Sequence, residues 1–426
     1  MKNPRFFLAP LDICGIYSAL TVGLRDLGYR ADFLNLSPQG YYGWSDSDNA
    51  LVIRIYLKAY RKFHSAKPSF WSKLYVYLLA WMLVAWVSLS FNVIILKSGE
   101  NITGSRFELA IYKFFKIKVI SFFHGSDSRP PYLSYHEGDI PTLYQSTQKT
   151  MRRVQEVYSY SDFVIDSPLS GHFQPGQCCM YQMIGNVVHS KKIPVTSDHK
   201  IKTRRQSPSK ILTVVHAPSN PELKGTFLIR ESIKNLQNEG IKFEYIEITG
   251  KSNQEVIELL SKADVAIDEM YSDMFGAVFA LETLGFAVPV IVGGYAKDTL
   301  MRFVPREAQM PTCYIHPSEL TEMLRKLLLD DQYRMRKSEQ ARNFYRSFAS
   351  DVQVASRLVR LATGQAPNSW FFDPQMIDYT FGTAAPKEKV EKQISLLVEQ
   401  FGFSGLMLDD KPGVLSNFKV MLSSKK

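Results

Sequence analysis

Residues 263–294, ADVAIDEMYSDMFGAVFALETLGFAVPVIVGG, contain the pattern that decides the fold. DVAID is a short apolar run typical of a buried strand, EMYSDMF is expected to be a loop, and VPVIVGG is expected to be the next strand. GAVFALETLGF predicts a helix with Val278, Leu281 and Leu284 on one face. Gly285 is its expected C-terminal cap. This order is one parallel βαβ unit, so we expect an α/β fold that binds ligands beyond the carboxyl ends of its strands.

Glu282 lies inside this mostly apolar helix, whose N-terminus points toward the carboxyl edge of the predicted sheet. A carboxylate in that position could accept hydrogen bonds from a ribose diol. The alternative is a solvated residue on the exposed face of the helix. The spacing alone does not decide between these two interpretations.

Length and composition indicate a cytosolic protein with more than one domain. A chain of 426 residues, 45% of them hydrophobic, exceeds the usual size of a single core. Its net charge of +10 favours an anionic partner, whether nucleic acid, acidic lipid headgroups or a phosphorylated substrate. The four cysteines include no CxxC pair, which predicts neither a disulfide framework nor a zinc site. The apolar run near the N-terminus is too short for a signal peptide.

Two strand ends in the first half carry candidate ligand-binding residues. RFFLAP predicts a strand, and Gly15 opens the next helix, where a backbone could approach a phosphate. Glycine is common in such turns, so Gly15 alone decides little. VISFF predicts another strand, and His124, Asp127 and Arg129 follow its carboxyl end, where α/β domains place ligand-binding groups. The alternative is a polar turn that caps the next helix.

Residues 74–96 contain no charged residue and are long enough to cross a membrane. The β-branched residues of FNVIIL favour a separate buried strand there, which leaves an apolar helix over residues 70–89. Three alternatives remain open for this helix: burial in a core, contact with a membrane surface, and a true span. Trp71, Trp81 and Trp86, with several basic residues nearby, would suit peripheral binding to an anionic membrane surface.

The second half follows a polar, basic linker. Its KIKTRR stretch has no accompanying nucleic-acid-binding signature, so nucleic acid is not expected as a partner. ILTVV then predicts a strand, and a helix begins near Lys224 and Gly225. A lysine before a helix opposes the helix dipole and should bring a compensating anion, which makes this turn a candidate diphosphate site. The alternative is a solvated lysine before a surface helix.

Together, FFHGSDSR (122–129), HAPSNPELKGT (216–226) and residues 263–291 resemble the retaining glycosyltransferases of the GT-B fold, family 4, and especially the bacterial surface-polysaccharide type. The resemblance implies two facing Rossmann-like domains with parallel sheets and a nucleotide-sugar between them. The implied parts are an acceptor-side domain over 1–186, a linker over 187–210, a nucleotide-sugar-binding domain over 211–345, a crossover helix over 346–365 and a C-terminal extension over 366–426.

The resemblance also implies roles for residues that match the family's motifs. Lys224 would bind donor phosphate, Glu282 would bind ribose as the second glutamate of an E-x7-E element, and His124 would contact the transferred sugar. His124 and Lys224 are thus the expected catalytic residues, and neither Lys224 nor Glu282 is expected to carry core packing. The implied donor-binding residues are Gly15, His216, Lys224, Gly225, Asp273, Phe275, Gly276 and Glu282, with Asp127, Arg129 and Glu269 as further polar residues of the cleft.

Two positions depart from the family's pattern. The first glutamate of the E-x7-E element falls at Met274, so Asp273 or Glu269 would have to replace it. His216 stands where the family has an arginine, which predicts a weaker, titratable cation.

The sequence therefore predicts a cytoplasmic glycosyltransferase that moves a sugar, with retention, from a nucleotide diphosphate donor to a glycan or lipid-linked acceptor. A peripheral position on the inner face of the membrane stays open. No Asp-x-Asp element follows a strand, so neither a metal nor another cofactor is expected, and the nucleotide-sugar is a substrate. The alternative, favoured by Met274, is a catalytically degenerate GT-B module that binds a nucleotide or glycan within a larger assembly.

Overall fold

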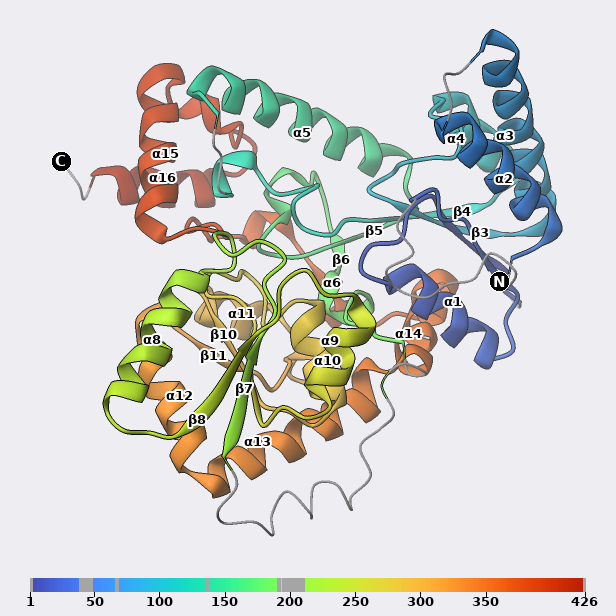
Figure 1. Ribbon diagram of the computed structural model, residues 1–426. Coiled ribbons are helices and arrows are strands. Elements are labelled where there is room, and N and C mark those ends of the chain that lie inside the picture. Colours follow the sequence, from blue (N-terminus) through green and yellow to red (C-terminus); the bar gives the residue numbers. More distant parts are fainter. Residues whose placement is uncertain are drawn as a thin grey trace.

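Two parallel β-sheets flanked by helices form the protein, as the computed structural model shows (Figure 1). Short buried strands alternate with amphipathic helices along the chain, and each parallel crossover needs such a helix to cover a face of the sheet. The expected α/β fold with two parallel-sheet domains is confirmed. The structure describes residues 3–37, 49–65, 69–134, 138–189, 193 and 211–423.

The first sheet has the strand order β12-β6-β5-β4-β3-β1-β2, and only β12 runs antiparallel to its neighbour. Its strands are β1 (Phe6–Ala9), β2 (Ala31–Phe33), β3 (Val93–Lys97), β4 (Lys118–Phe122), β5 (Phe163–Asp166), β6 (Cys178–Met180) and β12 (Phe371–Phe372). The helices of this half are α1 (Ile16–Asp26), α2 (Leu51–Ser65), α3 (Phe70–Ser90), α4 (Arg106–Phe114), α5 (Ile140–Tyr160) and α6 (Tyr181–Ile184).

The second sheet is entirely parallel, with the order β11-β10-β9-β7-β8. Its strands are β7 (Leu212–His216), β8 (Phe243–Glu247), β9 (Val265–Ile267), β10 (Val290–Gly293) and β11 (Cys313–Ile315). Its helices are α8 (Thr226–Asn238), α9 (Asn253–Leu260), α10 (Val278–Gly285), α11 (Lys297–Phe303), α12 (Leu320–Leu329) and α13 (Asp331–Phe344). The predicted βαβ unit is therefore β9, α10 and β10.

The chain returns to the first domain after α13. A π-helical turn, Tyr345–Ala349, interrupts the helix, and α14 (Asp351–Thr363) then packs along α1. The approach is close: a Cβ atom at Gly23 would lie 2.3 Å from the carbonyl oxygen of Asp351. Glycine at this position therefore allows the two helices to touch.

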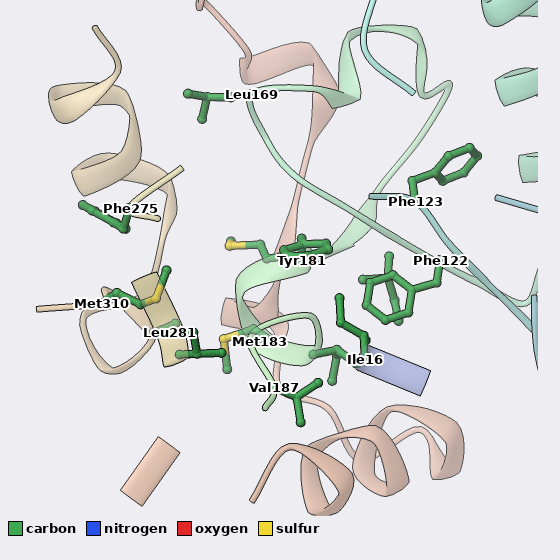
Figure 2. Packing of buried hydrophobic residues seen from close by; sticks show 14 of the residues in the cluster. Ile16, Phe122, Phe123, Leu169, Tyr181, Met183, Val187, Phe275, Leu281 and Met310 are labelled. Carbon is green, nitrogen blue, oxygen red and sulfur yellow. The ribbon is translucent and has the colours of Figure 1, made fainter. Parts of the chain in front are cut away.

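A shared apolar core joins the two domains. Figure 2 shows Phe122 and Tyr181 of the first domain in the same cluster as Phe275 and Leu281 of the second, with Met183 between them. All are buried. Because this contact is apolar and buried, it contributes to holding one sheet against the other.

The C-terminal extension contains α15 (Lys387–Phe401) and α16 (Pro412–Ser423), and α15 packs on α5 (Figure 1). Before α15, residues 379–385 form a segment that we call the strap. Thr383 of the strap donates from its N–H to the carbonyl of Leu133 in the first domain (2.9 Å). Its hydroxyl donates to the carbonyl of Tyr271 in the second (2.6 Å). The strap therefore connects both domains.

Helix α3 is the one helix of the described residues that is long and apolar enough to cross a membrane, although 28% of its most apolar window is buried within the protein. Leu83, Val84 and Val87 pack into the core beside the first sheet. One face of α3 is therefore part of the core, as the first alternative expects, and the other face is exposed. FNVIIL does form the separate buried strand β3.

Candidate active site

Lys224 lies in the tight turn between β7 and α8, as the sequence predicts. Gly225, the N-cap residue of α8, has a left-handed backbone (φ 70°), and a Cβ atom there would lie 2.8 Å from the Cβ of Met270. Glycine thus brings this turn against the loop that follows β9. Lys224 Nζ consequently reaches Asp268 Oδ1 at 3.1 Å and Glu269 Oε2 at 2.5 Å.

The compensating anion expected at Lys224 is supplied by the protein itself. The side chains of Lys224, Asp268 and Glu269 are 16%, 2% and 18% exposed, so the cluster is largely shielded from water. Burial raises the pKa of Asp268. Burial also opposes ionisation of Glu269, yet the Lys224 ammonium holds the pKa of Glu269 below its usual value. Lys224 is therefore part of a buried ion-pair cluster within the second domain.

Asp268 also connects Lys224 to the helix that carries Glu282. Its second oxygen, Oδ2, accepts a hydrogen bond from the N–H of Ala277 (3.1 Å), the N-cap residue of α10. Glu282 is only 5% exposed, which excludes a solvated surface position. Its Oε1 accepts a hydrogen bond from the side-chain amide of Asn253 at the start of α9 (2.9 Å).

His124 follows β4 and is enclosed by aromatic rings. Its Nε2 pairs with the Tyr17 hydroxyl at 3.0 Å, and its ring stacks on Phe122 with centroids 4.6 Å apart. Burial lowers the pKa of His124 to about 4, so the imidazole is neutral at physiological pH. Nδ1 has no hydrogen-bond partner among the described residues. It is a buried polar atom whose hydrogen-bonding capacity no described residue satisfies.

Arg129 and Asp273 form a buried ion pair between the two domains. Arg129 Nε donates to Asp273 Oδ2 at 2.9 Å, and the side chains are 8% and 4% exposed. Asp127, two residues earlier, accepts from the backbone N–H of His124 (2.7 Å) and from the Ser98 hydroxyl. The turn after β4 thus fixes His124 and carries the cation that binds the second domain.

His216 is not the weaker, titratable cation that the sequence predicts. The ring is fully buried, with Nδ1 facing the carbonyl of Ile267 (2.9 Å) and Nε2 facing the Thr226 hydroxyl (2.9 Å). Burial lowers the pKa of His216 to about 4. Both ring nitrogens are therefore engaged within the protein, and His216 supports the Lys224 turn through Thr226, the first residue of α8.

The remaining predicted residues lie around these groups. Gly15 has a left-handed backbone (φ 79°) at the N-cap of α1. A Cβ atom at Gly276 would lie 2.5 Å from the Cβ of Ala280, so glycine is needed where the chain enters α10. Phe275 is buried and accepts a hydrogen bond at its carbonyl from Thr312 (2.7 Å). Met274 packs against the core.

Sequence reasoning missed Asp166, which is fully buried at the end of β5. Its carboxylate accepts hydrogen bonds from Ser128 (2.9 Å), Ser170 (2.9 Å) and Gln174 (2.7 Å). Burial raises the pKa of Asp166 to about 7. Through Ser128 it anchors the turn that presents Arg129. The run FVID ends in an aspartate as DVAID does, and that position at a strand end could have identified Asp166.

The described residues contain no group of three or more His, Cys, Asp or Glu side chains that could hold a metal ion.

Comparisons with known proteins identify the fold. No family model and no curated protein matches the chain. Among solved structures, a glycosyltransferase from Rickettsia africae ESF-5 aligns over 86% of this chain and 100% of its own, with 11% identity and a TM-score of 0.50. Anabaena Alr3699/HepE in complex with UDP and glucose aligns over 85% and 99%, with 12% identity and a TM-score of 0.47. The two-domain fold of this chain is that of the GT-B glycosyltransferases.

Proposed function

We propose that this GT-B protein is a glycosyltransferase that moves a sugar, with retention and without a metal, from a nucleotide diphosphate donor to a glycan or lipid-linked acceptor. The observation that carries the proposal is the chain of contacts from Lys224 through Asp268 to the N-terminus of α10. It unites a cation, a helix N-terminus and, within that helix, Glu282 at the carboxyl edge of one parallel sheet. Such an edge is the usual ligand-binding position in parallel α/β folds.

Each group has a role that fits this chemistry. Backbone N–H groups at the start of α10 and the Lys224 ammonium would stabilise the charge that develops on the leaving diphosphate. Glu282 would accept hydrogen bonds from the ribose hydroxyls. The neutral His124, held by Tyr17, would offer Nδ1 to a hydroxyl of the transferred sugar.

Asp273 and Glu269 are the acids that would replace the family glutamate missing at Met274. Each is already paired, Asp273 with Arg129 and Glu269 with Lys224. To contact a sugar, either acid would have to share its lone pairs between the cation and the ligand. A carboxylate has two oxygens and about four acceptor positions, so such sharing is within its capacity.

These pairings also favour a second candidate, a GT-B module that binds a nucleotide or glycan without transferring sugar. With Met274 in the motif and both neighbouring acids engaged, the sugar would lack its usual carboxylate contact. Binding of the nucleotide part would be unaffected, since it depends on Lys224, Glu282 and the N–H groups at the start of α10.

We further propose that the protein works in the cytoplasm, as a peripheral protein at the inner face of the membrane. A lipid-linked acceptor would be located there, and the exposed face of α3 supports such a position.

Calorimetry with a panel of nucleotide diphosphate sugars tests the proposal. The wild type should bind at least one of them, and Glu282→Gln should weaken that binding by about 1.5–3 kcal/mol, the value of a hydrogen bond to a charged group. Glu258→Gln, an exposed change on α9, is the matched control and should bind as the wild type does. Binding accompanied by sugar transfer supports the enzyme, and binding alone supports the module. If no member of the panel binds, the proposal that the protein uses such a donor fails. If Glu282→Gln binds normally, the donor site lies elsewhere.

A further inference from the structure

Helix α3 has two apolar faces, and the described part of the protein covers only one of them. The residues of the outer face recur every three or four positions over most of the helix, which places them in one continuous strip. Their exposed fractions range from 38% to 74%, and they are Trp71, Leu74, Tyr75, Leu78, Met82 and Leu89. A strip of this length is larger than the scattered apolar residues found on ordinary protein surfaces.

Helix α4 extends this strip. The ring of Trp81 lies 5.9 Å from the ring of Phe107, which joins the two helices. Phe107 and Phe114 are 67% and 81% exposed. Figure 1 shows α2, α3 and α4 together at the end of the first domain that is remote from α8 and α12. We call the exposed residues of α3 and α4 the apolar face.

The charges that α2, α3 and α4 themselves carry are almost all positive. Neither α2 nor α3 contains an acidic residue, and the one acid of α4, Glu108, is buried and bonded to the Tyr112 hydroxyl (2.7 Å). The basic residues of α2 and α3 are Arg54, Lys58, Arg61, Lys62 and Lys73. An apolar strip bordered by positive charge is complementary to a bilayer with anionic headgroups, which offers acyl chains and phosphate together.

A pocket of about 360 Å³ opens at the C-terminal end of α4, beside the apolar face. Lys113, Lys116 and Lys118 line it, and Lys118 Nζ donates to the carbonyl of Ala362 (2.9 Å). Asp162 lines it too, and its carboxylate accepts a hydrogen bond from the N–H of Val119 (2.8 Å), so three lysines face one carboxylate there. Lys116 has a left-handed backbone (φ 53°) two residues after the end of the helix, where glycine is usual. This turn leads the chain from α4 past the pocket into β4.

We propose that this lysine pocket binds the phosphate of an anionic phospholipid headgroup while the apolar face lies in the outer part of the acyl layer. Lys113 and Lys116 supply the ammonium groups, and Phe114 between them enters the bilayer. The inference deepens the membrane position proposed above, and it rests on that part of the proposed function. It gives that position a defined ligand class and an orientation, with α4 toward the lipid.

Vesicle co-sedimentation tests this inference without any sugar donor or acceptor, so its outcome is separate from that of the transferase assay. The wild type should bind vesicles of phosphatidylcholine mixed with phosphatidylglycerol, and bind less to phosphatidylcholine mixed with the same fraction of oleate, whose charge is a carboxylate. Lys113→Gln/Lys116→Gln should lower the partition coefficient about thirty-fold on phosphatidylglycerol, the loss expected for two surface lysines. Trp71→Ser/Leu78→Ser should weaken binding to all of these vesicles.

Lys234→Gln/Lys242→Gln is the matched control, because it removes the same charge from exposed positions of the second domain. The control variant should lower the partition coefficient much less than the pocket variant Lys113→Gln/Lys116→Gln does. Hydrogen exchange of the wild type should show protection of residues 106–117 by the phosphatidylglycerol vesicles, which requires no variant to fold. Equal loss in pocket and control variants, equal binding to oleate vesicles, or absence of protection in α4 would overturn the inference.

Discussion

Replacing Lys224 by methionine should destabilise the second domain strongly. In the structure the ammonium lies 3.1 Å from Asp268 and 2.5 Å from Glu269, in a cluster whose three side chains are each less than a fifth exposed. Removing the cation leaves two adjacent carboxylates with little water. Breaking a buried ion pair from one side costs about 3–5 kcal/mol. For a unit of this size the corresponding fall in Tm is on the order of 10 °C.

The loss should depend on pH in a defined direction. Without the ammonium, burial and mutual repulsion raise the pKa of both carboxyls in the folded variant above their unfolded values of about 4. The folded variant then binds protons that the unfolded chain releases. Its stability deficit is therefore largest at neutral pH and shrinks as the pH falls toward the unfolded pKa values.

Urea denaturation at several pH values measures this deficit. Lys251→Met is the matched control, because Lys251 forms an exposed pair with Glu255 that water screens, so its loss should change stability little. Adding Glu269→Gln to Lys224→Met should recover part of the loss, since it removes one uncompensated charge. A Lys224→Met protein as stable as the wild type at neutral pH, or a deficit that does not change with pH, would refute the reasoning.

Two further predictions concern the first domain. Arg129→Gln should lower the Tm because it leaves Asp273 buried without its cation. The double variant Arg129→Gln/Asp273→Asn should have a Tm closer to that of the wild type. Equal Tm values for the single and double variants would argue against the interdomain ion pair. The His124 imidazole should stay neutral as the pH falls to about 5, since burial lowers its pKa from 6.5 to about 4. Because the unfolded ring takes up a proton near its ordinary pKa while the folded ring does not, the protein should lose stability as the pH falls from about 6.5 toward about 4. An NMR titration of His124 with a midpoint above about 6 would contradict that environment.

Patterns local in sequence predicted the fold well. The run of residues 263–294 became β9, α10 and β10, and the turn at Lys224 and Gly225 lies before α8 as expected. Such features depend on hydrophobic period and on glycine conformation, which neighbouring residues largely determine. Positions at strand ends were informative for the same reason, because parallel strands bring their carboxyl ends to one edge.

The pairings within the site could not be predicted in this way. Lys224 meets acids 44 and 45 residues later, and Arg129 meets Asp273 across the domains, 144 residues away. Such contacts depend on how separate units pack, which no local pattern contains. The same applies to His216. We expected a cation there, but the buried ring is neutral and each of its nitrogens has a hydrogen-bond partner. The strap was also missed, because nothing in its sequence predicts that Thr383 will bind the carbonyls of Leu133 and Tyr271.

The pairing of β12 with β6 has a consequence for synthesis. Phe371 and Phe372 complete the first sheet by adding a seventh, antiparallel strand beside Cys178 and Cys179. Translation proceeds from the N-terminus, so the edge of β6 has no neighbour while nearly two hundred further residues leave the ribosome. An uncovered edge strand is a template for pairing with another chain. The domain that is translated first is therefore the one whose sheet is completed last. A chain truncated before Phe371 would leave the edge of β6 exposed and prone to pair with another chain.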